Sequence, residues 1–105
     1  PPSSAASDVY KRQGLVTRIE CSIRPLAGDN GMWTLLFAAG MAGEQPSAIK
    51  AQGPFHGPFV AESVLNAIVD SLTLHGYQVA DDPQIWCVHL QAQLRRVNGH
   101  VHQAV

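Results

Sequence analysis

Residues 32–41 read MWTLLFAAGM, a run in which both alternating faces are apolar. One face carries Trp33, Leu35 and Phe37, and the other carries Met32, Leu36 and Ala38. A strand that is apolar on both faces is usually central in its sheet and covered on both sides. This run therefore predicts a central strand, and the rest of the chain has to cover two faces of it.

The segments on either side predict two more strands. From Leu15 to Ile23 the chain alternates between an apolar side and a polar side, which is the period of a half-buried strand. Residues 27–31, AGDNG, have the composition of a hairpin turn into the central strand. After a loop, Ser47–Gln52 predicts an edge strand, with Lys50 as a charge that discourages pairing with other chains.

The second half of the chain predicts helices. Residues 53–59, GPFHGPF, indicate a compact connector, because each proline lacks the N–H that a strand ladder needs. From Val60 to His75 an apolar stripe with helical spacing predicts the first helix, and Gly76 supplies its left-handed stop. The stripe consists of Ala61, Val64, Leu65, Ile68, Val69 and Leu72.

A second helix is predicted after the acidic cap and proline of Asp81-Asp82-Pro83, and Asn98-Gly99 ends it. Residues Trp86 to Val97 also alternate, so a strand over this segment stays open as an alternative. The expected fold class is α+β, with a three-stranded antiparallel sheet followed by two helices, in the order β-β-β-α-α.

The two ends of the chain are predicted to lie outside this fold. Residues 1–13, PPSSAASDVYKRQ, are small and polar with no apolar period, which is typical of a disordered leader. The same segment is similar to a translated sequencing-adapter junction of the kind found in metagenomic reading frames, and such scars are excluded from fold reasoning. We therefore expect a single domain over residues 14–98 and a C-terminal tail over residues 99–105.

Composition narrows the class of protein. A chain of 105 residues with 46% hydrophobic residues fits one domain with a single core. A formal net charge of -1 gives little electrostatic reason to bind nucleic acid or an anionic membrane. Cys21 and Cys87 both lie in apolar patterns and no export signal precedes them, so we expect both to be buried free thiols in a reducing cytoplasm.

The apolar excess of the central strand provides the main functional hypothesis. Three strands and one helix cannot hide all the apolar surface of Trp33, Leu35, Phe37 and Trp86, and exposed patches of this kind mark interfaces. The alternative is a fully internal core, in which the second helix covers the other face of the sheet. The sequence thus predicts a non-enzymatic domain that works through protein–protein contact, as a homodimer or as a regulatory accessory. We assign it no catalytic residue, no cofactor and no metal.

Two alternatives use other residues. Arg18 and Arg24 share one strand face, and with Lys50 they would make a weak nucleic-acid-binding surface whose affinity depends on salt. His56 lies on a loop before a helix N-terminus, where a small hydrolase or a metal protein would place a functional imidazole.

One stretch resembles a known group of proteins. Residues 53–97 combine a Gly-Pro-Phe turn, an amphipathic helix that ends in Gly-Tyr, and a helix rich in Trp, Leu, Gln and Arg. In these features the stretch resembles a family of small uncharacterised proteins of pseudomonad-type bacteria. The resemblance implies a bacterial cytoplasmic setting, and it implies no activity, cofactor or catalytic residue.

Overall fold

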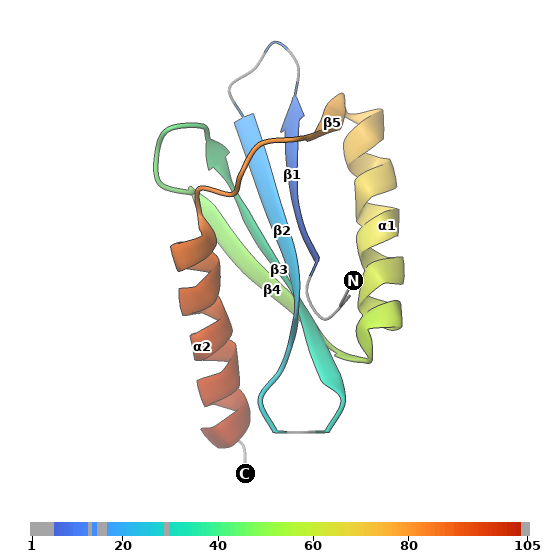
Figure 1. Cartoon of the computed structure of the whole chain (residues 1–105), viewed down its shortest axis with the longest axis vertical. Helices are drawn as coiled ribbons and strands as arrows, with labels where there is room; N and C mark the ends of the chain where they lie inside the picture. Colours follow the sequence, from blue (N-terminus) through green and yellow to red (C-terminus); the bar gives the residue numbers. More distant parts are fainter. Residues whose placement is uncertain (1–5, 13, 15–16, 29, 104–105) are drawn as a thin grey trace.

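The computed structural model describes residues 6–12, 14, 17–28 and 30–103. Within these residues the chain forms five strands and two helices, listed here in chain order: β1 (Ala6–Arg12), β2 (Thr17–Pro25), β3 (Met32–Met41), β4 (Ala48–His56), α1 (Pro58–Leu74), β5 (Tyr77–Ala80) and α2 (Cys87–Gln103). All neighbouring strands are antiparallel, in the order β4-β3-β2-β1-β5. The two helices cover opposite faces of this sheet (Figure 1).

The α+β class and the two helices are confirmed, but the prediction of three strands is wrong. The first additional strand, β1, lies in the segment that was expected to be a leader. It pairs with β2 on one side and β5 on the other. Val9 and Tyr10 are only 3% and 5% exposed because they point to opposite covered faces of the sheet. Residues 1–5 and 13 of the expected leader lie outside the described residues.

The second additional strand is β5, which follows α1 directly. It spans only Tyr77–Ala80 and its two middle residues are both exposed, so it has no alternating apolar pattern. Pairing with β1, from Val9 opposite Ala80 to Arg12 opposite Tyr77, holds it in place. A short strand of this kind owes its conformation to its neighbour, and its own sequence does not predict it.

The β2–β3 hairpin and the edge position of β4 are confirmed. β4 is longer than expected, because the first half of the GPFHGPF connector continues the strand to His56. A register shift in the pairing of β3 with β4 absorbs the irregularity, between Trp33 and Leu35. Gly53 lies in this region with φ of +131, and a Cβ there would stand 3.1 Å from the Trp33 carbonyl oxygen. Position 53 therefore requires glycine.

Both helices have shifted ends. α1 runs over Pro58–Leu74, close to the predicted span, and Gly76 follows it with φ of +91. α2 begins at Cys87, so the Asp-Pro pair that was predicted to open it lies in a preceding loop. The helical interpretation of Trp86–Val97 is confirmed over Cys87–Val97. The helix continues past Asn98-Gly99 to Gln103, through a segment that was expected to be a tail.

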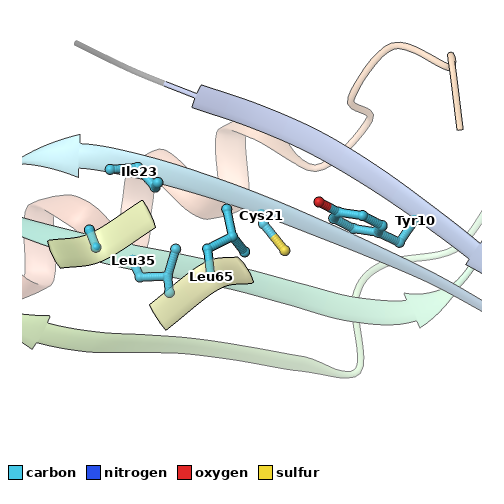
Figure 2. Close-up of a cluster of buried hydrophobic side chains, with 6 residues drawn as sticks. Tyr10, Cys21, Ile23, Leu35 and Leu65 are labelled. Atoms are coloured by element: carbon cyan, nitrogen blue, oxygen red, sulfur yellow. The ribbon is translucent and has the colours of Figure 1, made fainter. Parts of the chain in front are cut away.

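Each face of the sheet has its own core. On the α1 face, buried side chains of three strands pack against Ala61 and Leu65 of the helix (Figure 2). The sheet residues of this cluster are Tyr10, Cys21, Ile23 and Leu35. On the α2 face, Leu36 and Ala38 of β3 pack against Trp86 and Leu90. Among the described residues, neither helix has the length and apolarity to cross a membrane.

Candidate functional site

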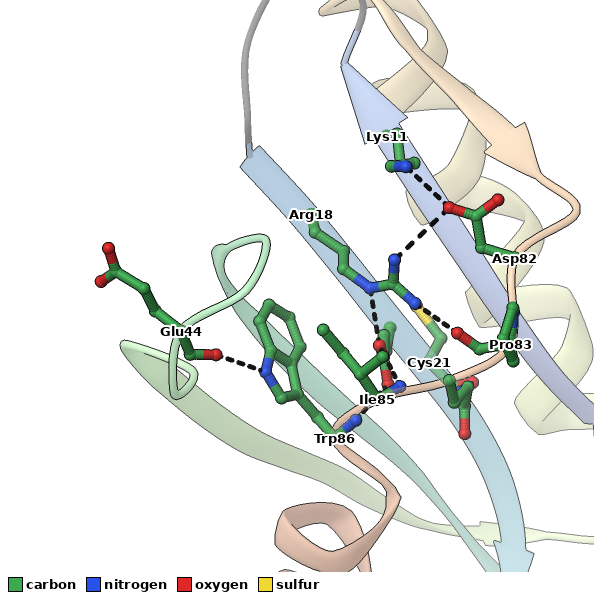
Figure 3. Close-up of polar contacts among 10 residues, drawn as sticks. Lys11, Arg18, Cys21, Glu44, Asp82, Pro83, Ile85 and Trp86 are labelled. Atoms are coloured by element: carbon green, nitrogen blue, oxygen red, sulfur yellow. Dashed lines mark hydrogen bonds and ion pairs between the residues drawn. The ribbon is translucent and has the colours of Figure 1, made fainter.

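The start of α2 is held by a buried ion pair from the middle of the sheet. Arg18 and Glu20 of β2 are 4% and 0% exposed, and the Arg18 Nε donates to Glu20 Oε2 at 2.7 Å. The same carboxylate accepts the backbone N–H groups of Ile85 at 2.9 Å and Trp86 at 3.0 Å (Figure 3). A carboxylate at a helix N-terminus satisfies free donors and suits the positive end of the dipole. Glu20 therefore caps α2 from another element, and we call this arrangement the Glu20 clamp.

A second set of contacts fixes the loop before α2. The Arg18 guanidinium donates through Nη2 to the Pro83 carbonyl oxygen, and Nη1 lies 3.6 Å from Asp82. Asp82 also accepts a 2.6 Å hydrogen bond from Lys11 of β1. This bond and the charge of Lys11 hold the pKa of Asp82 below its usual value. The loop is thus tied to β1 and β2 before the helix begins.

Trp86 joins the start of α2 to the β3–β4 loop. Its indole Nε1 donates to the Glu44 carbonyl oxygen at 2.8 Å, and only 2% of the residue is exposed (Figure 3). The ring packs with Leu36 and Leu90 in the core of the α2 face. A buried indole usually needs a partner for its N–H. The bond to Glu44 therefore fixes the distance between this loop and the helix.

Between the loop and the helix lies an open hollow of about 620 Å³, which we call the α2 hollow. Its lining residues are Gly43, Glu44, Gln45, Ile85, Trp86 and His89. The His89 Nδ1 is buried without a hydrogen-bond partner in the described part of the chain. On the adjoining surface, Ile85 is 48% exposed and Val88 is 71% exposed. The hollow combines an apolar rim with a few polar groups, which is the usual make-up of a binding site.

The expected burial of the two free cysteines is confirmed for Cys21 and is wrong for Cys87, which is exposed. Burial raises the pKa of the Cys21 thiol to about 12, and the nearby carboxylates of Asp8 and Glu20 add to this effect. Cys87 is exposed and lines a hollow of about 240 Å³ with Val88, Gln91 and Arg95. His89 lines the α2 hollow instead. The thiol of Cys87 and the imidazole of His89 therefore do not face a common site.

The residues predicted to form an apolar interface do not lie on an open surface. Leu35 is 0% exposed beneath α1, and Trp33 and Phe37 are half-buried against the same core. Trp86 belongs to the core on the opposite face. The sequence left open whether the second helix or a partner covers the other face of the sheet, and α2 covers it. The apolar side chains of β3 are thus buried or half-buried within one chain.

The three basic residues of the nucleic-acid alternative are not brought together. Arg18 is buried in the Glu20 clamp. Arg24 lies on the same face, half-buried beside α2. Lys50 stands opposite Phe37 in the register, and so projects on the α1 face. The structure therefore offers these residues no common surface.

His56, the residue of the hydrolase or metal alternative, is exposed at the end of β4. No group of three or more His, Cys, Asp or Glu side chains with the spacing of a metal site occurs in the part of the chain that the structure describes. Sequence reasoning missed the role of Glu20 and the polar lining of the α2 hollow. The Arg-x-Glu spacing of residues 18–20, which puts both charges on one strand face, is the only signal that points to the clamp.

The chain belongs to the PA4575-like protein family, whose model it matches over residues 6–105. The match includes the whole of the stretch 53–97 and confirms its resemblance to a pseudomonad-type family. No curated protein and no solved structure matches the chain significantly.

Proposed function

We propose that this protein is a non-enzymatic bacterial domain that binds another protein through the surface at the start of α2. The α2 hollow and the exposed side chains of Ile85 and Val88 make up this surface. It replaces the face of Trp33, Leu35 and Phe37, which α1 covers. The observation that carries the proposal is an open hollow with an apolar rim beside a rigidly held helix start.

The geometry suits recognition of a protruding side chain. The hollow of about 620 Å³ is open to solvent and not enclosed, so it has room for a side chain that protrudes from a partner surface. The Glu20 clamp and the Trp86 bond fix both walls of the hollow before binding, so little conformational entropy would be lost when a partner binds.

We place this role in the cytoplasm, because the exposed thiol of Cys87 suits a reducing compartment. A regulatory accessory role fits the proposal better than a homodimer formed by the apolar face of β3.

The test is site-specific photo-crosslinking in the bacterial cell that makes the protein. A photoreactive residue at position 88 should give one discrete protein adduct, because Val88 stands on the rim of the surface. The matched control places the same group at Leu74, which is 87% exposed on α1. Ile85→Asp should weaken the adduct from position 88. An equal adduct from position 74, or none from position 88, would contradict the proposal.

A further inference from the structure

The edge of β4 is the second surface of this chain that suits a partner. β4 is the terminal strand of the sheet and pairs with β3 alone, with Leu35 opposite Gln52. Thr34 Oγ1 donates to the Gln52 carbonyl oxygen at 2.9 Å, so Gln52 turns its backbone groups towards β3. Backbone direction alternates along an antiparallel strand. Ile49 and Ala51 therefore turn their N–H and C=O groups towards the outer edge.

The side chains on this edge differ between the two faces of the sheet. Ile49 and Ala51 are half-buried and extend the core of the α2 face to the edge. Lys50 is exposed on the other face and has no ion pair within the described residues. A strand added beside β4 would continue the apolar layer on one face and meet a positive charge on the other.

This charge distinguishes between the possible occupants of the edge. If two copies paired antiparallel with Ile49 opposite Ala51, each Lys50 would stand directly opposite the other. Like charges at directly opposed positions destabilise a strand pair, and a lysine on an edge strand discourages self-association. A different chain with an acidic residue at that position would instead form an attractive cross-strand pair.

We propose that the β4 edge accepts an extended strand of a partner protein, with an aspartate or glutamate opposite Lys50. This inference rests on the proposed function, that the chain binds a protein, and it adds the form and charge of the bound segment. Recognition would be by strand addition, in which main-chain hydrogen bonds supply affinity and alternate side chains supply specificity. The loop that lines the α2 hollow leads directly into β4, so the two surfaces adjoin.

The experiment titrates two synthetic peptides into the isotopically labelled full chain and follows the backbone amide signals by NMR. The first is acetylated and amidated Ser-Thr-Val-Glu-Val-Thr-Ser, whose valines would face the α2 side when its glutamate faces Lys50. The second carries lysine in place of the glutamate. We expect the glutamate peptide to shift the amide signals of Ile49 and Ala51, with roughly fivefold higher affinity than the lysine peptide.

Two variants sharpen the result. Lys50→Glu changes an exposed side chain and should reverse the preference between the two peptides. Ala51→Pro removes an outward N–H that the pairing with β3 does not use, and edge strands tolerate proline at such positions. It should abolish binding of both peptides while the other amide signals stay in place. If Ala51→Pro does not fold, the Lys50→Glu reversal still decides the question.

Several results would overturn the inference. They are the absence of a shift at Ile49 and Ala51 at millimolar peptide, equal affinity for both peptides, and an unchanged preference in Lys50→Glu. A wild-type dimer that Lys50→Glu does not affect and Ala51→Pro dissociates would assign the edge to a second copy. Failure with the peptides while the position 88 adduct persists would remove this inference and leave the proposed function standing.

Discussion

The two faces of the sheet hold their helices by different means. On the α1 face the buried contacts are mainly between apolar side chains, such as Leu35 and Leu65. On the α2 face the apolar cluster is smaller, and the buried Arg18–Glu20 pair shares the task of holding the helix. Apolar contacts contribute in proportion to the area they bury. A buried ion pair depends on both partners at once, because either charge alone is costly. The α2 face should therefore be the more sensitive to a single polar substitution.

The largest expected effect comes from breaking the Glu20 clamp. Glu20→Gln removes the buried counter-charge of Arg18, leaves only the partly exposed Asp82 at 3.6 Å, and sets an amide donor against backbone donors. We expect a loss of about 4 kcal/mol in the free energy of unfolding, measured by urea denaturation. The double variant Arg18→Met with Glu20→Leu should lose less unfolding free energy than Glu20→Gln alone, because no charge remains buried. A double variant as unstable as the single one would show that the comparison between the faces is wrong.

On the α1 face, Leu35→Ala should be the matching test. Leu35 is 0% exposed in the centre of that core, so truncation removes apolar contacts and leaves a cavity. The expected loss is about 3 kcal/mol in the same urea experiment. Leu35→Met, which roughly conserves volume, should cost under about 1.5 kcal/mol. Equal losses for alanine and methionine would mean that packing does not stabilise this face.

The smallest effect concerns the Lys11–Asp82 pair at the surface. Lys11 lowers the pKa of Asp82 in the folded chain, so the ionised carboxylate stabilises the fold above its ordinary pKa of 3.8. That contribution is lost as the pH falls through the lower folded value. Asp82→Asn should therefore be slightly less stable than the wild type at pH 7, because exposed pairs contribute little.

The check for Asp82→Asn is urea unfolding of both proteins over the acidic range. The difference in unfolding free energy between the wild type and the variant should close as the pH falls below about 4. A difference that widens as the pH falls would contradict the prediction that the ionised Asp82 carboxylate stabilises the fold.

The sequence predicts those elements whose own residues determine them. The stripe of α1 and the two apolar faces of β3 extend over enough residues to define a period. β1 and β5 do not, since β1 buries little more than Val9 and Tyr10 and β5 is four residues long. β1 takes its conformation from pairing with β2 and β5, and β5 takes its conformation from pairing with β1, so no local pattern predicts either strand.

The candidate site is less predictable still. Asp82-Pro83 has the composition of a helix start, but Lys11 binds Asp82 and the cap of α2 comes from Glu20 in another strand. The α2 hollow forms where residues 43–45 meet residues 85–89. Neither segment has a motif of its own, so only the fold reveals the site.

The pairing of β1 with β5 has a consequence for synthesis of the chain. β1 leaves the ribosome before β2, β3 and β4, yet one of its edges is covered only when Tyr77–Ala80 have followed. A nascent chain that stalls before Tyr77 carries an unfinished sheet with a bare strand edge, which is prone to pair with neighbouring chains. The sheet is therefore complete only after Tyr77–Ala80 have been made, and we expect chains that stall before this point to aggregate more readily than the folded chain.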